Sequence, residues 1–104
     1  MSAPISHTVF FTLNDPSAEA ADHLVAQCMK YLDNHPGLVY FAVGRLNTEL
    51  NRPVNDHDYH VSLHTTFEDR KAHDDYQVAP RHLEFIEANK ASWKNVRVFD
   101  SDLA

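Results

Sequence analysis

Residues 5–13 read ISHTVFFTL, and this stretch decides the fold. Apolar and polar side chains alternate along it with a period of two, which is the pattern of a β-strand that packs one face against a core. His7, Val9 and Phe11 fall on the predicted inner face, whereas Phe10 falls on the other face. The chain therefore begins with a half-buried strand whose inner face carries a histidine.

A helix is predicted directly after this strand. Asp15 is the expected N-cap and Pro16 the expected first helical residue, because proline fits that position without losing a hydrogen bond. Apolar residues then recur at helical spacing as far as Leu32. The helix is expected to end before Pro36, which cannot continue it.

The rest of the chain completes an α+β pattern. Three further strands, a loop and two short helical stretches are predicted, at residues 38–46, 59–66 and 96–100 for the strands, 47–58 for the loop, and 68–78 and 80–90 for the helical stretches. The order is β-α-β-β-α-β, the ferredoxin-like arrangement, with an antiparallel sheet and the helices on one face. A length of 104 residues predicts one domain over residues 1–104.

Composition excludes several classes of partner. The net charge of −6 disfavours nucleic acid and anionic membrane surfaces, since both require a basic face. The longest apolar run, residues 38–43, is far too short to span a bilayer, and the N-terminus lacks the pattern of a signal peptide. A soluble, cytoplasmic protein is therefore expected. Cys28 is the only cysteine, so one chain cannot form a disulfide framework.

Motifs for nucleotides and metals are missing. Gly37 and Gly44 are the only glycines, which excludes the phosphate-binding glycine loops and the G-x-S-x-G elbow. His60 and His64 point the same way on the predicted strand but lie roughly 13 Å apart, at about 3.3 Å per residue, too far to share an ion within one chain. We therefore expect no metal and no organic cofactor, with a site shared between two chains left open.

Four polar residues are candidates for acid–base chemistry. Tyr76 and His82 flank the predicted helix break at Ala79-Pro80, and a histidine near a phenol suits general acid–base catalysis. Asp100 is expected to face inward and to need an imidazole partner. The last strand of this fold runs antiparallel beside the first, so Asp100 and His7 should meet at one edge. The alternative reading is that these groups only close off the core.

The two faces of the sheet are expected to differ in use. A ligand pocket is predicted between the sheet and the helices, lined by Val9, Phe11, Leu63, Phe85, Ile86 and Trp93. The opposite face is expected to meet a second copy of the chain and to carry Thr8, Phe10, His60, Ser62 and His64. Three other histidines are predicted to lie exposed and to matter little, namely His23, His35 and His73.

A set of short motifs in fixed order resembles the stress-responsive A/B barrel (Dabb) family. They are residues 5–11, His35-Pro36-Gly37, Phe41-x-x-Gly44, Thr66-Phe67, Tyr76-x-x-x-Pro80-x-His82-x-x-Phe85 and Val96-x-Val98-x-Asp100. The resemblance implies a ferredoxin-like monomer that pairs through its sheet into a dimeric α/β barrel. It covers nearly the whole chain.

One plant polyketide cyclase of that family implies specific roles. Its catalytic Tyr and His correspond to Tyr76 and His82, its supporting Asp to Asp100, and a first-strand His to His7. That enzyme works without a cofactor. The chain departs from the pattern where Ile86 replaces a glycine of the pocket wall.

Three functions follow as expectations. The first is binding of a small, partly apolar molecule by a Dabb-type homodimer of unassigned role. The alternative is a cofactor-free cyclase- or lyase-like enzyme acting on a small carbonyl compound through His82 and Tyr76. The second alternative is a monooxygenase-like member of the dimeric α+β barrel group.

Overall fold

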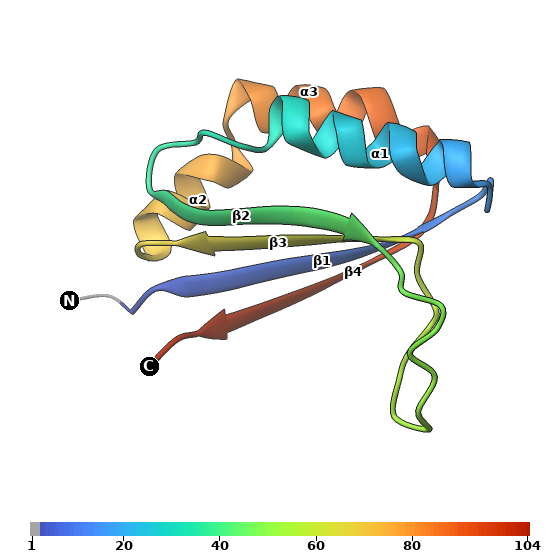
Figure 1. The fold of residues 1–104 in the computed structure, drawn as a ribbon. Helices are drawn as coiled ribbons and strands as arrows, with labels where there is room; N and C mark the ends of the chain where they lie inside the picture. The colour runs from blue at the N-terminus through green and yellow to red at the C-terminus, as the bar shows by residue number, and fades with distance from the viewer. Residues whose placement is uncertain (1–2) are drawn as a thin grey trace.

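The computed structural model describes residues 3–104 and has one antiparallel sheet. Its strands are β1 (Ile5–Leu13), β2 (Leu38–Arg45), β3 (Val61–Phe67) and β4 (Trp93–Asp102), in the order β2-β3-β1-β4. The helices are α1 (Ala18–Tyr31), α2 (Arg70–Gln77) and α3 (Pro80–Asn89), followed by a short 3₁₀ turn at Lys90–Ser92. All three helices lie on the same side of the sheet (Figure 1). The predicted ferredoxin-like arrangement is confirmed.

Strand β1 runs through the middle of the sheet with the predicted alternation. Every second residue from Ile5 to Leu13 is buried, and His7 is buried with them. The core forms between this face and the helices, where Phe11, Leu63 and the helix α1 residue Leu24 are each at most 2 % exposed. Burial of these apolar side chains supplies the main stabilisation of the fold.

Helix α1 begins two residues later than predicted. Ser17, and not Asp15, is the N-cap, because the Ser17 hydroxyl accepts a hydrogen bond from the Ala20 backbone N–H. The Asp15 carboxylate instead accepts a hydrogen bond from the Ser17 N–H, which fixes the turn before the helix. Asp15 and Ser17 are both residues that can cap a helix, and Ser17, which lies nearer to the first helical residue, takes the N-cap position.

Two strand boundaries also differ from the prediction. Strand β4 begins at Trp93, three residues before the expected Val96, and pairs with the end of β1 across a register shift at Leu13. Its first residues are largely polar and exposed because β4 is an edge strand, so they show no alternation. Strand β3 begins at Val61, two residues after the predicted start.

The break between α2 and α3 is formed as the sequence indicates. Asp69 caps α2 by accepting a hydrogen bond from the Ala72 N–H, and Pro80 occupies the first turn of α3. Ala79 has extended backbone angles, with φ −64° and ψ 139°, as expected for a residue that precedes proline. The break turns the chain so that the end of α2 and the start of α3 face the same part of the sheet (Figure 1).

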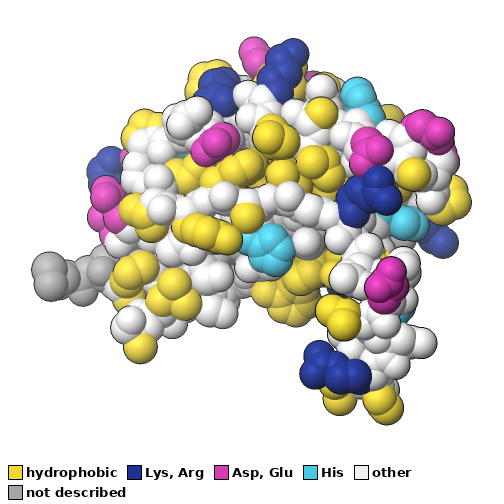
Figure 2. Space-filling view, in the orientation of Figure 1, with side chains coloured by type: hydrophobic (Ala, Val, Ile, Leu, Met, Phe, Trp, Pro, Cys, Tyr) yellow, Lys and Arg dark blue, Asp and Glu magenta, His cyan; other side chains and the backbone are white. Residues whose placement is uncertain are grey.

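The sheet face opposite the helices carries an aromatic cluster. The Phe10 ring lies 4.9 Å from that of Tyr59, 5.6 Å from that of Phe99 and 6.4 Å from that of His64, measured between centroids. The irregular loop 47–58 projects beyond the sheet on this side (Figure 1). Hydrophobic side chains line the concave surface between this loop and the sheet (Figure 2). We call this surface the open sheet face. No helix within residues 3–104 is long and apolar enough to cross a bilayer.

One residue predicted for the open sheet face is used elsewhere. The His60 ring nitrogen Nδ1 accepts a hydrogen bond from the Leu13 N–H, so His60 closes the end of β1. His64 stays on the face and contacts the Ser62 hydroxyl at 3.0 Å. The prediction placed His60 on this face as well because it began the strand at Tyr59, two residues too early.

Candidate functional site

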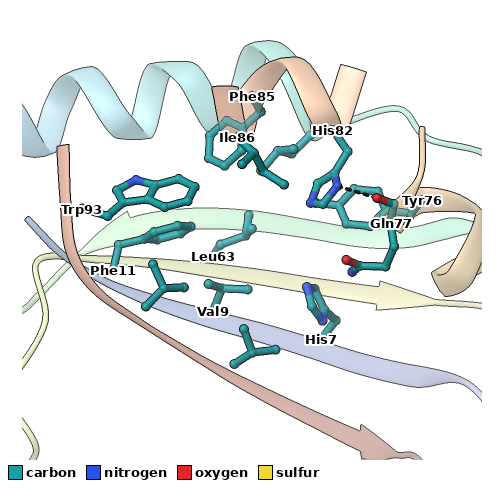
Figure 3. Close-up of a pocket in the computed structure, with 13 residues that line it drawn as sticks. His7, Val9, Phe11, Leu63, Tyr76, Gln77, His82, Phe85, Ile86 and Trp93 are labelled. Atoms are coloured by element: carbon teal, nitrogen blue, oxygen red, sulfur yellow. Dashed lines mark hydrogen bonds between the residues drawn. The ribbon is translucent and has the colours of Figure 1, made fainter. Parts of the chain in front are cut away.

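A cavity of about 180 Å³ lies between the sheet and helices α2 and α3. It is lined by all six residues predicted as pocket walls, together with His7, Tyr76, Gln77 and His82. Figure 3 shows these side chains converging from β1, β3 and the two helices on one space. The cavity is smaller than the roughly 300 Å³ at which ligand pockets usually begin, so a ligand of only a few heavy atoms fits it.

One end of the cavity is aromatic. The Trp93 ring lies 5.1 Å from the Phe11 ring and 5.7 Å from the Phe85 ring. Ile86, which replaces the glycine of the related cyclase, lines the cavity from α3 and takes up part of its volume. This end therefore suits an apolar group.

The other end of the cavity holds the polar residues. Tyr76 is 2 % exposed, and its hydroxyl has no hydrogen-bond partner within residues 3–104. Burial raises the pKa of Tyr76, so the phenol stays protonated and can donate a hydrogen bond. At the apolar end, the Trp93 indole N–H is likewise buried without a partner among residues 3–104. Both donors belong to residues that line the cavity, but each donor atom is itself covered, so a ligand reaches either one only after a small side-chain movement.

His82 stacks beside Tyr76 with 4.5 Å between ring centroids. Its Nδ1 lies 3.1 Å from the carbonyl oxygen of Gln77, and this contact requires Nδ1 to carry the proton. Nε2 is then left with a lone pair, and Figure 3 shows the ring directed into the cavity. Burial is the main cause that lowers the pKa of His82, and the Gln77 carbonyl partly opposes it. A neutral imidazole is thereby favoured.

Asp100 does not support His82. Its carboxylate Oδ1 lies 2.6 Å from Nδ1 of His7, and its side chain is 49 % exposed. Asp100 lies on the inner face of the sheet, directly opposite His7, but its side chain stays half exposed because β4 is an edge strand. The expected meeting of Asp100 with His7 at one edge is present, and the backbone carbonyl of Gln77 takes the supporting role assigned to Asp100.

Two of the three histidines predicted to be exposed lie at this site. His35 is 8 % exposed, donates a hydrogen bond from Nε2–H to the Tyr31 carbonyl oxygen at 2.8 Å, and packs on the Tyr76 ring at 4.9 Å between centroids. The His73 side chain is 15 % exposed and lies 5.2 Å from the His7 ring. Only His23 is exposed as expected.

Spacing in the sequence contained a signal for His73. It lies three residues before Tyr76 and four before Gln77, so all three share one face of α2. His35 had no such signal, because its burial depends on the turn after α1 folding back onto Tyr76. Cys28 adds no nucleophile, since burial raises the pKa of its thiol to about 12.

Comparison with protein families gives a match over nearly the whole chain. A family described as the stress responsive A/B barrel domain matches residues 5–103. A search of curated protein sequences gives no match.

Three solved structures have the same fold. A Dabb family protein with a ferredoxin-like fold from Mesorhizobium loti is 24% identical, with a TM-score of 0.80 over 98% of both chains. A dimeric ferredoxin-like protein of unknown function from Thermobifida fusca is 15% identical, with a TM-score of 0.79 over 99% of this chain and 93% of that one. A hydroxynitrile lyase from Passiflora edulis is 17% identical, with a TM-score of 0.77 over 100% of this chain and 96% of that one. At these identities the likeness establishes the fold alone.

Proposed function

Since the chain belongs to the stress-responsive A/B barrel family, we propose that it binds a small, partly apolar molecule in the cavity between its sheet and helices α2 and α3. The observation that carries the proposal is the buried Tyr76 hydroxyl, which has no partner among the described residues and belongs to a side chain that lines the cavity. A buried hydroxyl without a hydrogen bond costs about 1–3 kcal/mol, and a ligand oxygen accepting from it removes this cost.

The proposed ligand follows from the two ends of the cavity. The apolar end, at Phe11, Phe85 and Trp93, takes an alkyl or aryl group. The polar end takes an oxygen that accepts a hydrogen bond from Tyr76 and lies near Nε2 of His82. Small aldehydes, ketones and alcohols combine these features within about 180 Å³.

A binding screen tests this proposal. Ligand-observed NMR with short aliphatic and aromatic carbonyl compounds is run on the wild type, on Tyr76→Phe and on a His23→Ala control that changes an exposed histidine of α1. We expect binding to the wild type and to His23→Ala, with weaker binding to Tyr76→Phe. Equal binding to all three proteins would contradict the assignment of the oxygen to Tyr76.

A second variant tests the role of cavity volume. Ile86→Ala removes side-chain atoms from the wall and should admit larger members of the same compound series. Unchanged selectivity for ligand size would place the bound molecule elsewhere.

A second candidate function is cofactor-free acid–base catalysis at the same place. Nε2 of His82 is the available base, and Tyr76 is the available donor to an oxygen that gains negative charge. The fold shared with a hydroxynitrile lyase suggests one concrete assay. Removal of the hydroxyl proton of a cyanohydrin by His82 would break the carbon–carbon bond and release a carbonyl compound and cyanide.

The assay measures aldehyde released from an aromatic cyanohydrin by the wild type, His82→Ala and His23→Ala. Activity in the wild type and the control that is lost in His82→Ala supports catalysis. Release by His82→Ala at the wild-type rate excludes His82 as the base.

We further propose that the open sheet face pairs with a second copy of the chain. Support comes from the aromatic cluster around Phe10 and from the half-exposed Phe99 on that face. Structural relatives described as dimeric share the fold. Covering this face would bury an apolar surface that the helices leave open.

A further inference from the structure

Three side chains from separate elements converge beyond the polar end of the cavity. They are His7 on β1, His73 on α2 and Asp100 on β4. One ligand atom from each lies within 4.8 Å of the others, and no other such group of histidine, cysteine and carboxylate side chains occurs in the part of the chain that the structure describes. The sequence excluded an ion shared by His60 and His64 within one chain, and the fold brings together a different set.

The chemistry of the three groups fits one class of ion. Two imidazoles and one carboxylate are the ligand set of mononuclear divalent transition-metal sites that keep open positions. We propose that His7, His73 and Asp100 bind a divalent transition-metal ion, with zinc as the natural probe. This site shares His7 with the lining of the cavity but does not require the ligand proposed there.

The distances require little movement. Nδ1 of His7 and Oδ1 of Asp100 are 2.6 Å apart, and a hydrogen bond from the ring N–H to the carboxylate joins them in the metal-free protein. Ligand atoms bound to one ion at about 2.0–2.2 Å lie roughly 3 Å apart, so the ion replaces the proton when these atoms separate slightly. The half-exposed Asp100 side chain can make this adjustment while His7 stays fixed in the core.

His73 is already oriented as a ligand. Asp74 Oδ1 lies 3.0 Å from Nδ1 of His73, and a carboxylate behind one ring nitrogen leaves the other nitrogen as the donor to a metal. Gln77 Nε2 contacts the other nitrogen, Nε2, at 3.5 Å, which is a weak contact for an ion to displace. The arrangement is the outer-shell support that metal-binding histidines commonly have.

A solvent-filled hollow gives the ion access and open coordination positions. The hollow has a volume of about 370 Å³ and borders His73, Asp100 and Asp102. Arg70 also borders it, but its guanidinium is held by both carboxylate oxygens of Asp74, at 2.9 and 3.1 Å. The acidic net charge of the chain favours a cation at this place.

Titration with zinc measures the site directly. Isothermal titration calorimetry of the full chain with zinc chloride should give one ion per chain, and cobalt should give a visible absorption spectrum of a site with nitrogen and oxygen ligands. His73→Gln and Asp100→Asn should each weaken zinc binding more than about tenfold, since even outer-shell changes cost about 10–100-fold. The control His23→Gln changes an exposed histidine and should bind as the wild type does.

Two outcomes overturn the proposal. One is a wild type that takes up no zinc. The other is zinc binding that is equal in the wild type, His73→Gln and Asp100→Asn, which would assign the ion to other histidines. Circular dichroism of each variant separates loss of the site from loss of the fold. Asp100→Asn keeps a side-chain oxygen that can accept the hydrogen bond from His7, so we expect this variant to stay folded.

Discussion

Asp100 lies directly opposite His7 on the neighbouring strands β4 and β1, with 2.6 Å between Oδ1 and Nδ1. The pair joins a buried ring to a carboxylate at the solvent edge of the sheet. It joins the end of β4 to the start of β1 at the edge of the core.

Replacing Asp100 by alanine should lower the free energy of unfolding by about 1–3 kcal/mol, because the buried His7 N–H loses its acceptor. Urea denaturation with a chelator present measures this. Asn95→Ala, at an exposed position of the same strand, is the control and should change little. A loss as small as that of the control would mean that water replaces the carboxylate without cost.

Gly37→Ala should be more damaging, at about 2 kcal/mol or more. Gly37 has a φ of 79°, which alanine adopts only with strain, and the added Cβ would overlap the Cβ of Ala72. Gly44→Ala is the matched control, because its new Cβ meets no atom within 4 Å. Thermal melts of both variants decide the matter, and equal melting temperatures would contradict the close approach of α2 to this turn.

The His82 imidazole should titrate below the ordinary histidine pKa of 6.5, because burial disfavours its charged form. Between the two pKa values, the His82 ring is protonated in the unfolded chain but neutral in the folded chain. The free energy of unfolding should therefore fall as the pH drops from above 6.5 to the folded-state pKa, and this contribution levels off below it. NMR titration of the His82 ring, assigned by His82→Gln and performed with a chelator, gives the pKa. A value above 6.5 would show that the ring is more solvated than the structure has it.

Phe99→Glu should convert the dimer to a monomer, because it puts a charge in the proposed interface on the open sheet face. Leu83→Glu makes the same change on α3 at matched exposure, 51% against 52% for Phe99, and should leave the dimer intact. Light scattering at micromolar concentration measures both. A wild type with the mass of one 11.9 kDa chain would refute the dimer outright.

The order of strands and helices along the chain was sufficient to predict the fold and, through it, the meeting of His7 with Asp100. In a ferredoxin-like sheet β1 is an inner strand, and the topology of this fold places β4 beside it. The walls of the cavity were equally predictable, since Phe11 and Phe85 follow from the periods of a strand and a helix.

The hydrogen bonds of the site could not be predicted in this way. His82 is held by the Gln77 carbonyl because the chain turns sharply at Ala79, and no side-chain pattern encodes that contact. The burial of His35 likewise depends on a turn packing against a distant helix. The half exposure of Asp100 depends on β4 lying at the sheet edge, which the alternation of its side chains does not reveal.

A crystal structure with the best carbonyl ligand from the binding screen tests the central claim most directly. The account predicts the ligand between Phe11, Phe85 and Trp93, with an oxygen within about 3.2 Å of the Tyr76 hydroxyl. A ligand bound outside this cavity, or inside it with the Tyr76 hydroxyl still unpaired, would contradict the account.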